Sequence, residues 1–217
     1  MSVVGEVEAD LRNRMLRGEL LPGTRCCPEE IAGQLGSCQE ATFEALQRLI
    51  AVGLLERDAV GGVAVPRITS AQAVEMFALR RAIEPVLLSR AMPSLTVADL
   101  AEAEMAASGN EVSVTLAEAN WAFHRALYRP SNWDRGLMLV EILYAAAAPY
   151  VEICGHVQEP ESRDGHAGML DAVRRGDEKA ALETLRDHLD LAESVLVGFL
   201  GTEGSRTYNG NESPSAS

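Results

Sequence analysis

The feature that most constrains the fold is an unbroken series of helical patterns from Ser70 to about Leu200. Apolar residues in this part of the chain recur at the three- and four-residue spacing of amphipathic helices, and no segment shows the alternation of a strand. Ser70 can cap the first helix, and Pro85 is expected to kink it or mark a break. We expect further helices near 96–107, 112–129, 134–154, 163–175 and 177–200. Short connections predict an all-α bundle over residues 69–200, and the Gly- and Ser-rich tail 201–217 predicts disorder.

The first 68 residues carry a different order of elements. Helical patterns over residues 3–18, 28–36 and 39–52 each end at or next to a glycine. Two short apolar runs then flank Gly61 and Gly62, which predicts a β-hairpin. This order is typical of a winged helix-turn-helix, so we expect a mainly α protein with that domain over residues 1–68. A small packed α+β domain without nucleic-acid contacts would show the same pattern.

Composition limits the function and the compartment. The chain has 19 Lys+Arg against 32 Asp+Glu, a formal charge of −13, which argues against a general polyanion binder but permits a local basic patch. The N-terminus shows no signal-peptide pattern, and the longest apolar stretch, Leu137 to Val151, is too short to span a bilayer. The four cysteines form no CxxC pair. We therefore expect a cytoplasmic protein with reduced thiols and no membrane partner.

Histidines on several of the expected helices indicate a metal site. Asn120 and His124 are spaced i, i+4 and therefore share one face of a helix. His188 falls on an apolar stripe with Leu185 and Leu189, so it is expected to face the bundle interior. Histidines that point inward from different helices could converge on a divalent metal. Spacing alone equally allows each histidine to be a separate hydrogen-bonded or exposed side chain.

The sequence also resembles a known family. The segments MLRGELLPGTR, EEIAGQLG, EALQRLIAVGLL and GGVAV resemble the winged helix of GntR-family regulators. ALRRAIEP, WAFHRALY and GHAGMLDAVRRGDEKAALETLRDHL resemble the FCD effector domain of the FadR-like subfamily. The resemblance implies a homodimer that binds operator DNA, and a divalent metal ion (Zn, Ni or Mn) held by Asn120, His124, His166 and His188. His156 has no counterpart in the family pattern and is expected at the surface.

The resemblance further implies a small carboxylate effector. Arg80 matches a common arginine of the FCD family and is the candidate for binding this carboxylate, since arginine offers bidentate geometry. Three neutral histidines and an asparagine would leave the charge of a divalent ion uncompensated, which favours an anionic ligand. An intramolecular ion pair between Arg80 and Glu84, spaced i, i+4, is the alternative role for Arg80.

The recognition helix departs from the family pattern, which reads roughly S-R-T-P-V-R-E-A-L. Gln39 and Phe43 stand where the family has arginines, and Glu40 adds a carboxylate where DNA would approach. Residues 1–66 contain six basic and ten acidic residues, a net charge of −4. The remaining candidates for DNA contact are Arg25, Gln39, Thr42 and Arg48.

These observations predict a ligand-responsive, DNA-binding transcriptional regulator whose C-terminal bundle binds a divalent metal and a small organic acid. The alternative is a repurposed scaffold that has lost DNA binding and acts as a metal-dependent enzyme or a small-molecule-binding protein. No residue is nominated as catalytic, because no nucleophile or base motif singles out a reaction. A purely structural partner protein is a third alternative.

Overall fold

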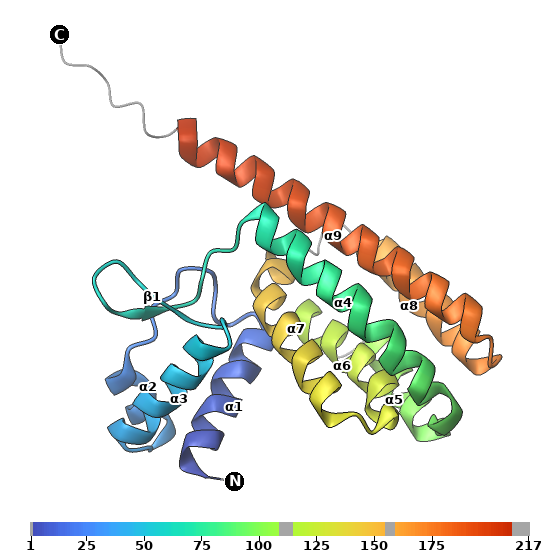
Figure 1. Ribbon diagram of the computed structural model, residues 1–217, viewed down its shortest axis with the longest axis horizontal. Helices are drawn as coiled ribbons and strands as arrows, with labels where there is room; N and C mark the ends of the chain where they lie inside the picture. Colours follow the sequence, from blue (N-terminus) through green and yellow to red (C-terminus); the bar gives the residue numbers. More distant parts are fainter. Residues whose placement is uncertain (1, 109–114, 155–158, 210–217) are drawn as a thin grey trace.

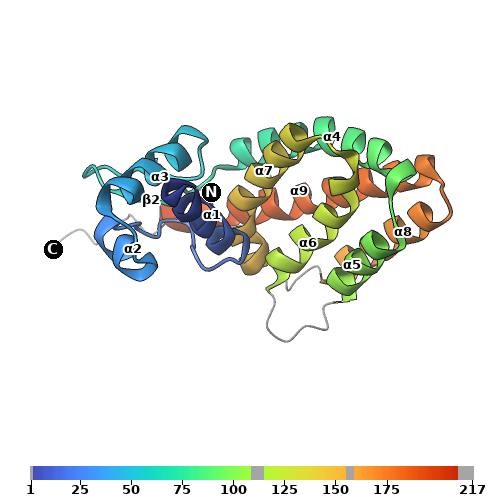
Figure 2. The same ribbon diagram turned by 90° about the horizontal axis from the view of Figure 1, so that it is seen from below.

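The computed structural model describes residues 2–108, 115–154 and 159–209. A winged helix-turn-helix domain occupies one end of the molecule and a helical bundle the other, as Figures 1 and 2 show. The mainly helical architecture predicted from the sequence is confirmed.

The N-terminal domain is built on three helices, α1 (Val3–Leu16), α2 (Pro28–Leu35) and α3 (Gln39–Ala51). Pro28 occupies the first turn of α2, where its missing N–H costs nothing, and Gly36 ends that helix in the left-handed conformation (φ 62°). The domain core is aliphatic and includes Leu11, Leu46 and Leu49, which are at most 1% exposed. The three apolar faces therefore meet as their sequence periods predict.

The wing is a two-stranded antiparallel hairpin, β1 (Glu56–Arg57) and β2 (Val63–Ala64), in which Glu56 is paired with Ala64. Asp58 closes the turn, since its Oδ1 accepts hydrogen bonds from the backbone N–H groups of Val60 (3.0 Å) and Gly62 (2.7 Å). Gly61 has φ +85°, a conformation that glycine adopts without strain. The hairpin predicted around Gly61 and Gly62 is thus confirmed.

The bundle begins at α4 (Ser70–Ala91), whose N-cap is Thr69 rather than the expected Ser70. Thr69 and Gln72 form a reciprocal capping box there. Pro85 lies inside α4, and the helix continues through it without a break. The other bundle helices are α5 (Val97–Ser108), α6 (Leu116–Tyr128), α7 (Asp134–Cys154), α8 (Glu159–Arg174) and α9 (Glu178–Asn209), and short 3₁₀ turns cover Met92–Ser94 and Arg129–Ser131.

The C-terminal part of the chain differs from the sequence expectation. Helix α9 continues to Asn209, although disorder was expected from residue 201 (Figure 1). The residues from 201 to 209 contain two glycines, each of which disfavours a helix by about 1 kcal/mol, but no proline, so a helix that is already propagating can continue through them. The rest of the expected tail, 210–217, lies outside the described residues, as does His156. Within the described ranges, no helix is both long and apolar enough to cross a membrane.

Helix α7 connects the bundle to the winged domain. It packs beside α1, a neighbourhood visible in Figures 1 and 2. Glu141 of α7 lies 3.7 Å from the Nε of Arg12 on α1. Nearer the C-terminus of α7, the hydroxyl of Tyr150 accepts a hydrogen bond from the backbone N–H of Ile68 (3.0 Å), in the segment that joins the two domains. The winged domain therefore rests on the same helix that forms one wall of the bundle core.

Candidate functional site: a buried histidine cluster

Three histidines meet in the core of the bundle, one from each of three helices. His124 lies on α6, His166 on α8 and His188 on α9, and one ring nitrogen from each lies within 4.8 Å of the others. Their exposed fractions are 0%, 6% and 7%. We call these three residues the histidine cluster. The convergence expected from the sequence is therefore present, and the alternative of three separate histidines is not what the structure shows.

Local sequence explains why these side chains point inward. On α6 the buried positions Ala117, Trp121, His124 and Tyr128 follow the helical period, so one face carries the site into the core. On α9, Leu185 and Leu189 are fully buried on either side of His188. His166 stacks on the ring of Phe123, with ring centroids 4.0 Å apart. Aliphatic and aromatic packing thus fixes the direction of each imidazole.

Burial also fixes the charge of the cluster. Desolvation, followed by the mutual repulsion of the histidines, holds the pKa of His124 and of His166 well below the usual value. Desolvation and then the nearby positive charge of Arg80 lower the pKa of His188 to about 4. The three side chains are therefore neutral imidazoles at physiological pH, the form that binds metal ions.

Beside the cluster lies a buried charge pair. Arg80 is 4% exposed and Glu84 is fully buried, and the Nε of Arg80 donates to Oε1 of Glu84 at 2.5 Å. The guanidinium also stacks over the ring of Tyr144, with its carbon 3.9 Å from the ring centroid. The i, i+4 ion pair considered as the alternative role for Arg80 is therefore formed. This hydrogen bond uses one of the five N–H donors of the guanidinium.

Glu84 has two further partners that sequence reasoning missed. The hydroxyl of Tyr128 donates to Oε2 of Glu84 at 2.7 Å, and the hydroxyl of Tyr144 donates to the same oxygen at 3.3 Å. We call Arg80, Glu84, Tyr128 and Tyr144 the Glu84 network. Burial first, and the charge of Glu84 after it, raise the pKa of Tyr128 well above the usual value, so its hydroxyl stays protonated. Tyr128 follows His124 at i+4, and this spacing was the available sequence signal.

Asn120, the fourth proposed ligand, lies one helical turn before His124 on α6 and is partly buried. The shared face predicted from the i, i+4 spacing follows from the helix that both residues occupy.

The histidine cluster fits a metal ion by its chemistry. In the part of the chain that the structure describes, Nε2 of His166 and Nδ1 of His188 are buried without a hydrogen-bond partner. Buried polar atoms normally have a hydrogen-bond partner in a folded protein, and binding of a ligand would explain why these two nitrogens have none.

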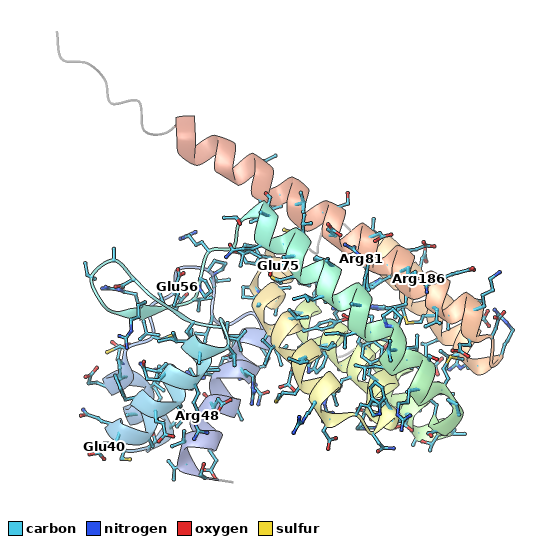
Figure 3. All side chains as sticks on the ribbon, viewed as in Figure 1. Glu40, Arg48, Glu56, Glu75, Arg81 and Arg186 are labelled. Atoms are coloured by element: carbon cyan, nitrogen blue, oxygen red, sulfur yellow. The ribbon has the colours of Figure 1, made fainter. Side chains whose placement is uncertain are left out.

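The residues predicted to contact DNA are divided between surface and core. Gln39, the predicted DNA contact at the start of α3, lies exposed, as do Glu40 and Phe43, and we call these three residues the recognition face; Phe43 is 53% exposed. Figure 3 shows Glu40 at the outer end of α3. Thr42 is instead fully buried, with its hydroxyl bonded to Ser37 (2.8 Å), so this side chain holds the helix-turn-helix together and is not on the exposed face.

The arginines of the winged domain that were predicted to contact DNA are paired with carboxylates. Arg25 makes two hydrogen bonds to Oδ2 of Asp58 in the wing, at 2.8 and 2.6 Å. Arg48 donates to Glu44 at 2.7 Å and lies 3.8 Å from Glu8 of α1. Both arginine side chains remain more than half exposed to solvent. They can reach DNA only in competition with these carboxylates.

Together, the fold and the cluster define a class of protein: a winged helix-turn-helix joined to an all-α bundle whose core brings histidines together beside a buried arginine. A family model described as the FCD domain matches residues 75–191, more than half of the chain. The chain belongs to the FCD domain family of GntR-type transcriptional regulators.

Relatives and solved structures extend the likeness over both domains. The chain is 28% identical over 206 residues to the HTH-type transcriptional regulator McbR of Escherichia coli K12, with 90% of this chain and 93% of the relative covered. It is 26% identical to a D-xylose utilization operon transcriptional repressor of Paenarthrobacter nicotinovorans, over 87% of this chain and 86% of the relative. The solved structure of E. coli McbR/YncC matches with a TM-score of 0.78 at 24% identity, covering 90% of this chain and 97% of that chain. A GntR regulator from Rhodococcus sp. RHA1 matches with the same TM-score and identity, covering 91% and 99%. These structures confirm the fold.

The Glu84 network generates a stability prediction. Replacing Glu84 with Ala leaves the guanidinium of Arg80 buried without its counter-charge, which is expected to lower the free energy of unfolding by about 3–5 kcal/mol. Urea denaturation followed by circular dichroism measures the change. Glu44→Ala is the matched control, because Glu44 and Arg48 form an i, i+4 pair that is exposed, and its loss should cost less than about 1 kcal/mol. Equal destabilisation by the two variants would contradict the importance of the buried pair.

Proposed function

We propose that the chain is a ligand-responsive transcriptional regulator that works as a homodimer. In this proposal the winged domain binds operator DNA, while the bundle binds one divalent metal ion and a small organic acid. The observation that carries the proposal is the convergence of three neutral, buried imidazoles from α6, α8 and α9.

The proposed metal ligands are His124, His166, His188 and Asn120. Imidazole nitrogens suit zinc and nickel, and the amide oxygen of an asparagine is also acceptable to manganese. A bound divalent ion would supply positive charge and an open coordination position for an oxygen of the effector. The chain's own contribution is to keep the three imidazoles neutral and correctly directed by burial.

The charge balance of the site favours an anionic effector. Three neutral imidazoles and an amide bring no negative charge to a divalent ion, and the nearby carboxylate of Glu84 is already paired with Arg80. A carboxylate ligand would supply the missing charge. Arg80 is the proposed second contact for this carboxylate. Its hydrogen bond to Glu84 uses Nε, and the N–H groups of the two terminal nitrogens are further donors that a carboxylate can accept from.

The proposed DNA contact is made by the recognition face with limited help from arginines. The N-terminal residues of a recognition helix meet base edges in the major groove, where a glutamine can read adenine. Gln39 is the residue at that place in α3. Because Arg25 and Arg48 are paired with carboxylates, few phosphate contacts are expected, and affinity should depend weakly on salt.

A second candidate function follows from the same surface. The paired arginines, together with exposed Glu40 and Glu44, favour a scaffold that has lost DNA binding and acts as a metal-dependent enzyme or a small-molecule-binding protein. A bound metal ion could then serve as a Lewis acid. The two candidates differ in whether the full-length protein selects specific DNA.

The metal proposal predicts about one divalent ion per purified chain, measured by elemental analysis. The double variant His124→Ala with His188→Ala removes two of the three converging imidazoles and should abolish binding. His156→Ala is the control, since this fourth histidine is outside the proposed ligand set. Unchanged metal content in the double variant would refute the assignment.

The DNA proposal predicts that the protein specifically retains DNA fragments from its own promoter. For a dimer with two arginine–phosphate contacts per chain, a plot of the logarithm of the binding constant against the logarithm of the salt concentration should have a slope no steeper than about −4. Glu40→Arg should steepen this slope and raise affinity for non-specific DNA. Glu75→Arg makes the same charge change on α4 of the bundle, away from α3 in Figure 3, and should leave the slope unaltered. Absence of specific binding at low salt across genomic fragments would favour the second candidate function.

The effector proposal predicts that Arg80→Lys weakens binding of a small carboxylate without loss of metal. Lysine keeps a positive charge beside Glu84 but lacks the planar fork that holds a carboxylate through two bonds, so roughly a tenfold loss is expected. Titration calorimetry with a panel of small organic acids measures it. Arg81→Lys is the control, because Arg81 pairs with Asp190 and Glu193 of α9 instead, between the helices as Figure 3 shows. The same affinity in wild type and Arg80→Lys would exclude Arg80 from the effector contact.

A further inference from the structure

A continuous chain of buried hydrogen bonds leads from the Glu84 network into the histidine cluster. The Nδ1 atom of His124 lies 3.0 Å from the hydroxyl of Tyr128, which in turn lies 2.7 Å from Oε2 of Glu84. All three side chains are 0% exposed. The bonds span α6 and α4, and no water-exposed group interrupts them.

The proton positions along this chain follow from the chemistry of its members. Glu84 is paired with Arg80 and accepts hydrogen bonds only, so the single hydroxyl proton of Tyr128 is directed at Oε2. The oxygen of Tyr128 is then left as an acceptor. The contact between Tyr128 and His124 therefore requires the proton to be on Nδ1 of the imidazole.

We propose that Glu84 and Tyr128 are positioning residues that hold His124 in the Nδ1–H tautomer, with the lone pair of Nε2 directed into the histidine cluster. This inference rests on the proposed function only in taking a divalent metal as the occupant of the cluster. A ligand histidine whose outer N–H is fixed by a hydrogen bond has its ring orientation and tautomer set before the metal arrives. Here the hydroxyl of Tyr128 lies between the carboxylate of Glu84 and the imidazole of His124, so the carboxylate orients the histidine through the tyrosine.

The other two histidines lack such support, which makes His124 the preorganised ligand. Nδ1 of His188 and Nε2 of His166 are buried without a hydrogen-bond partner among the described residues. Nε2 of His188 lies 3.3 Å from Nε2 of His124. Since the Nε2 of His124 presents a lone pair, His188 carries its proton on Nε2 in the absence of metal. Ligation through Nε2 of His188 would therefore require this proton to move to Nδ1, whereas His124 needs no such change.

Glu84 has a second effect on the same site. The positive charge of Arg80 acts on both His124 and His188 and would oppose a cation bound between them. The carboxylate of Glu84 compensates that charge through its 2.5 Å contact with Arg80. One buried carboxylate thus orients a ligand and also makes the surroundings tolerant of a metal ion.

The tautomer can be tested directly on the full-length protein, stripped of metal and labelled with ¹⁵N at histidine. Long-range proton–nitrogen correlation spectra should show His124 protonated at Nδ1 and His188 at Nε2. In Tyr128→Phe the preference of His124 should be lost. Tyr144→Phe is the matched control, because it removes a hydroxyl from the same Glu84 oxygen and leaves the partner of His124 in place. A wild-type His124 protonated at Nε2 would overturn the proposal without any variant having to fold.

The consequence for metal binding is measured by titrating Zn²⁺ in competition with a chelator. Tyr128→Phe is expected to weaken Zn²⁺ binding about 10–100-fold, and Tyr144→Phe should bind as wild type does. Equal Zn²⁺ affinity in wild type and Tyr128→Phe would overturn the positioning role. A wild-type protein that binds no Zn²⁺, Ni²⁺ or Mn²⁺ would instead contradict the proposed function, and the spectra would still decide the tautomer.

Discussion

The carboxylate of Glu84 is the buried charge on which the arrangement of the bundle depends. It accepts hydrogen bonds from Arg80 on its own helix, from Tyr128 on α6 and from Tyr144 on α7. A buried charge that loses its partners costs several kcal/mol, so these three helices can move relative to one another only if the bonds are kept or replaced. The position of His124 follows, because the same Tyr128 hydroxyl contacts its ring.

Helix α7 carries this constraint to the winged domain. Tyr144 faces the Glu84 network, while Glu141 and Tyr150 on the same helix contact Arg12 and the backbone of Ile68. If a ligand at the histidine cluster rotated α7, the contacts of this helix with α1 and with the segment that joins the two domains would therefore change. These contacts connect the two domains through α7, and a ligand in the bundle would act on the winged domain through them only if it favoured one of two discrete positions of this helix.

Sequence patterns predicted the elements well because burial in a helix leaves a strict period. The wing, the order of the helices and the inward direction of His188 all followed from spacing, and the FCD resemblance selected the histidines that converge. The hydrogen bonds of Tyr128 and Tyr144 to Glu84 could not be predicted, since they join residues 44 and 60 positions apart on helices whose rotation is set by packing. Thr42 shows the same limit: its place in the motif suggests the surface, but its hydroxyl is taken up by Ser37.

The acidic residues of the winged domain limit its affinity for DNA, because they pair with the arginines that could contact phosphates. A guanidinium that contacts a phosphate must first leave Asp58 or Glu44, so the gain on binding DNA is the difference between two charge-assisted contacts rather than a full one. Non-specific binding depends almost entirely on such phosphate contacts and is therefore reduced most. A contact between a base edge and Gln39 would not be reduced in this way, because this side chain is exposed and carries no charge that an ion pair could take up. A domain with net charge −4 can thus keep selectivity for an operator while losing general affinity for DNA.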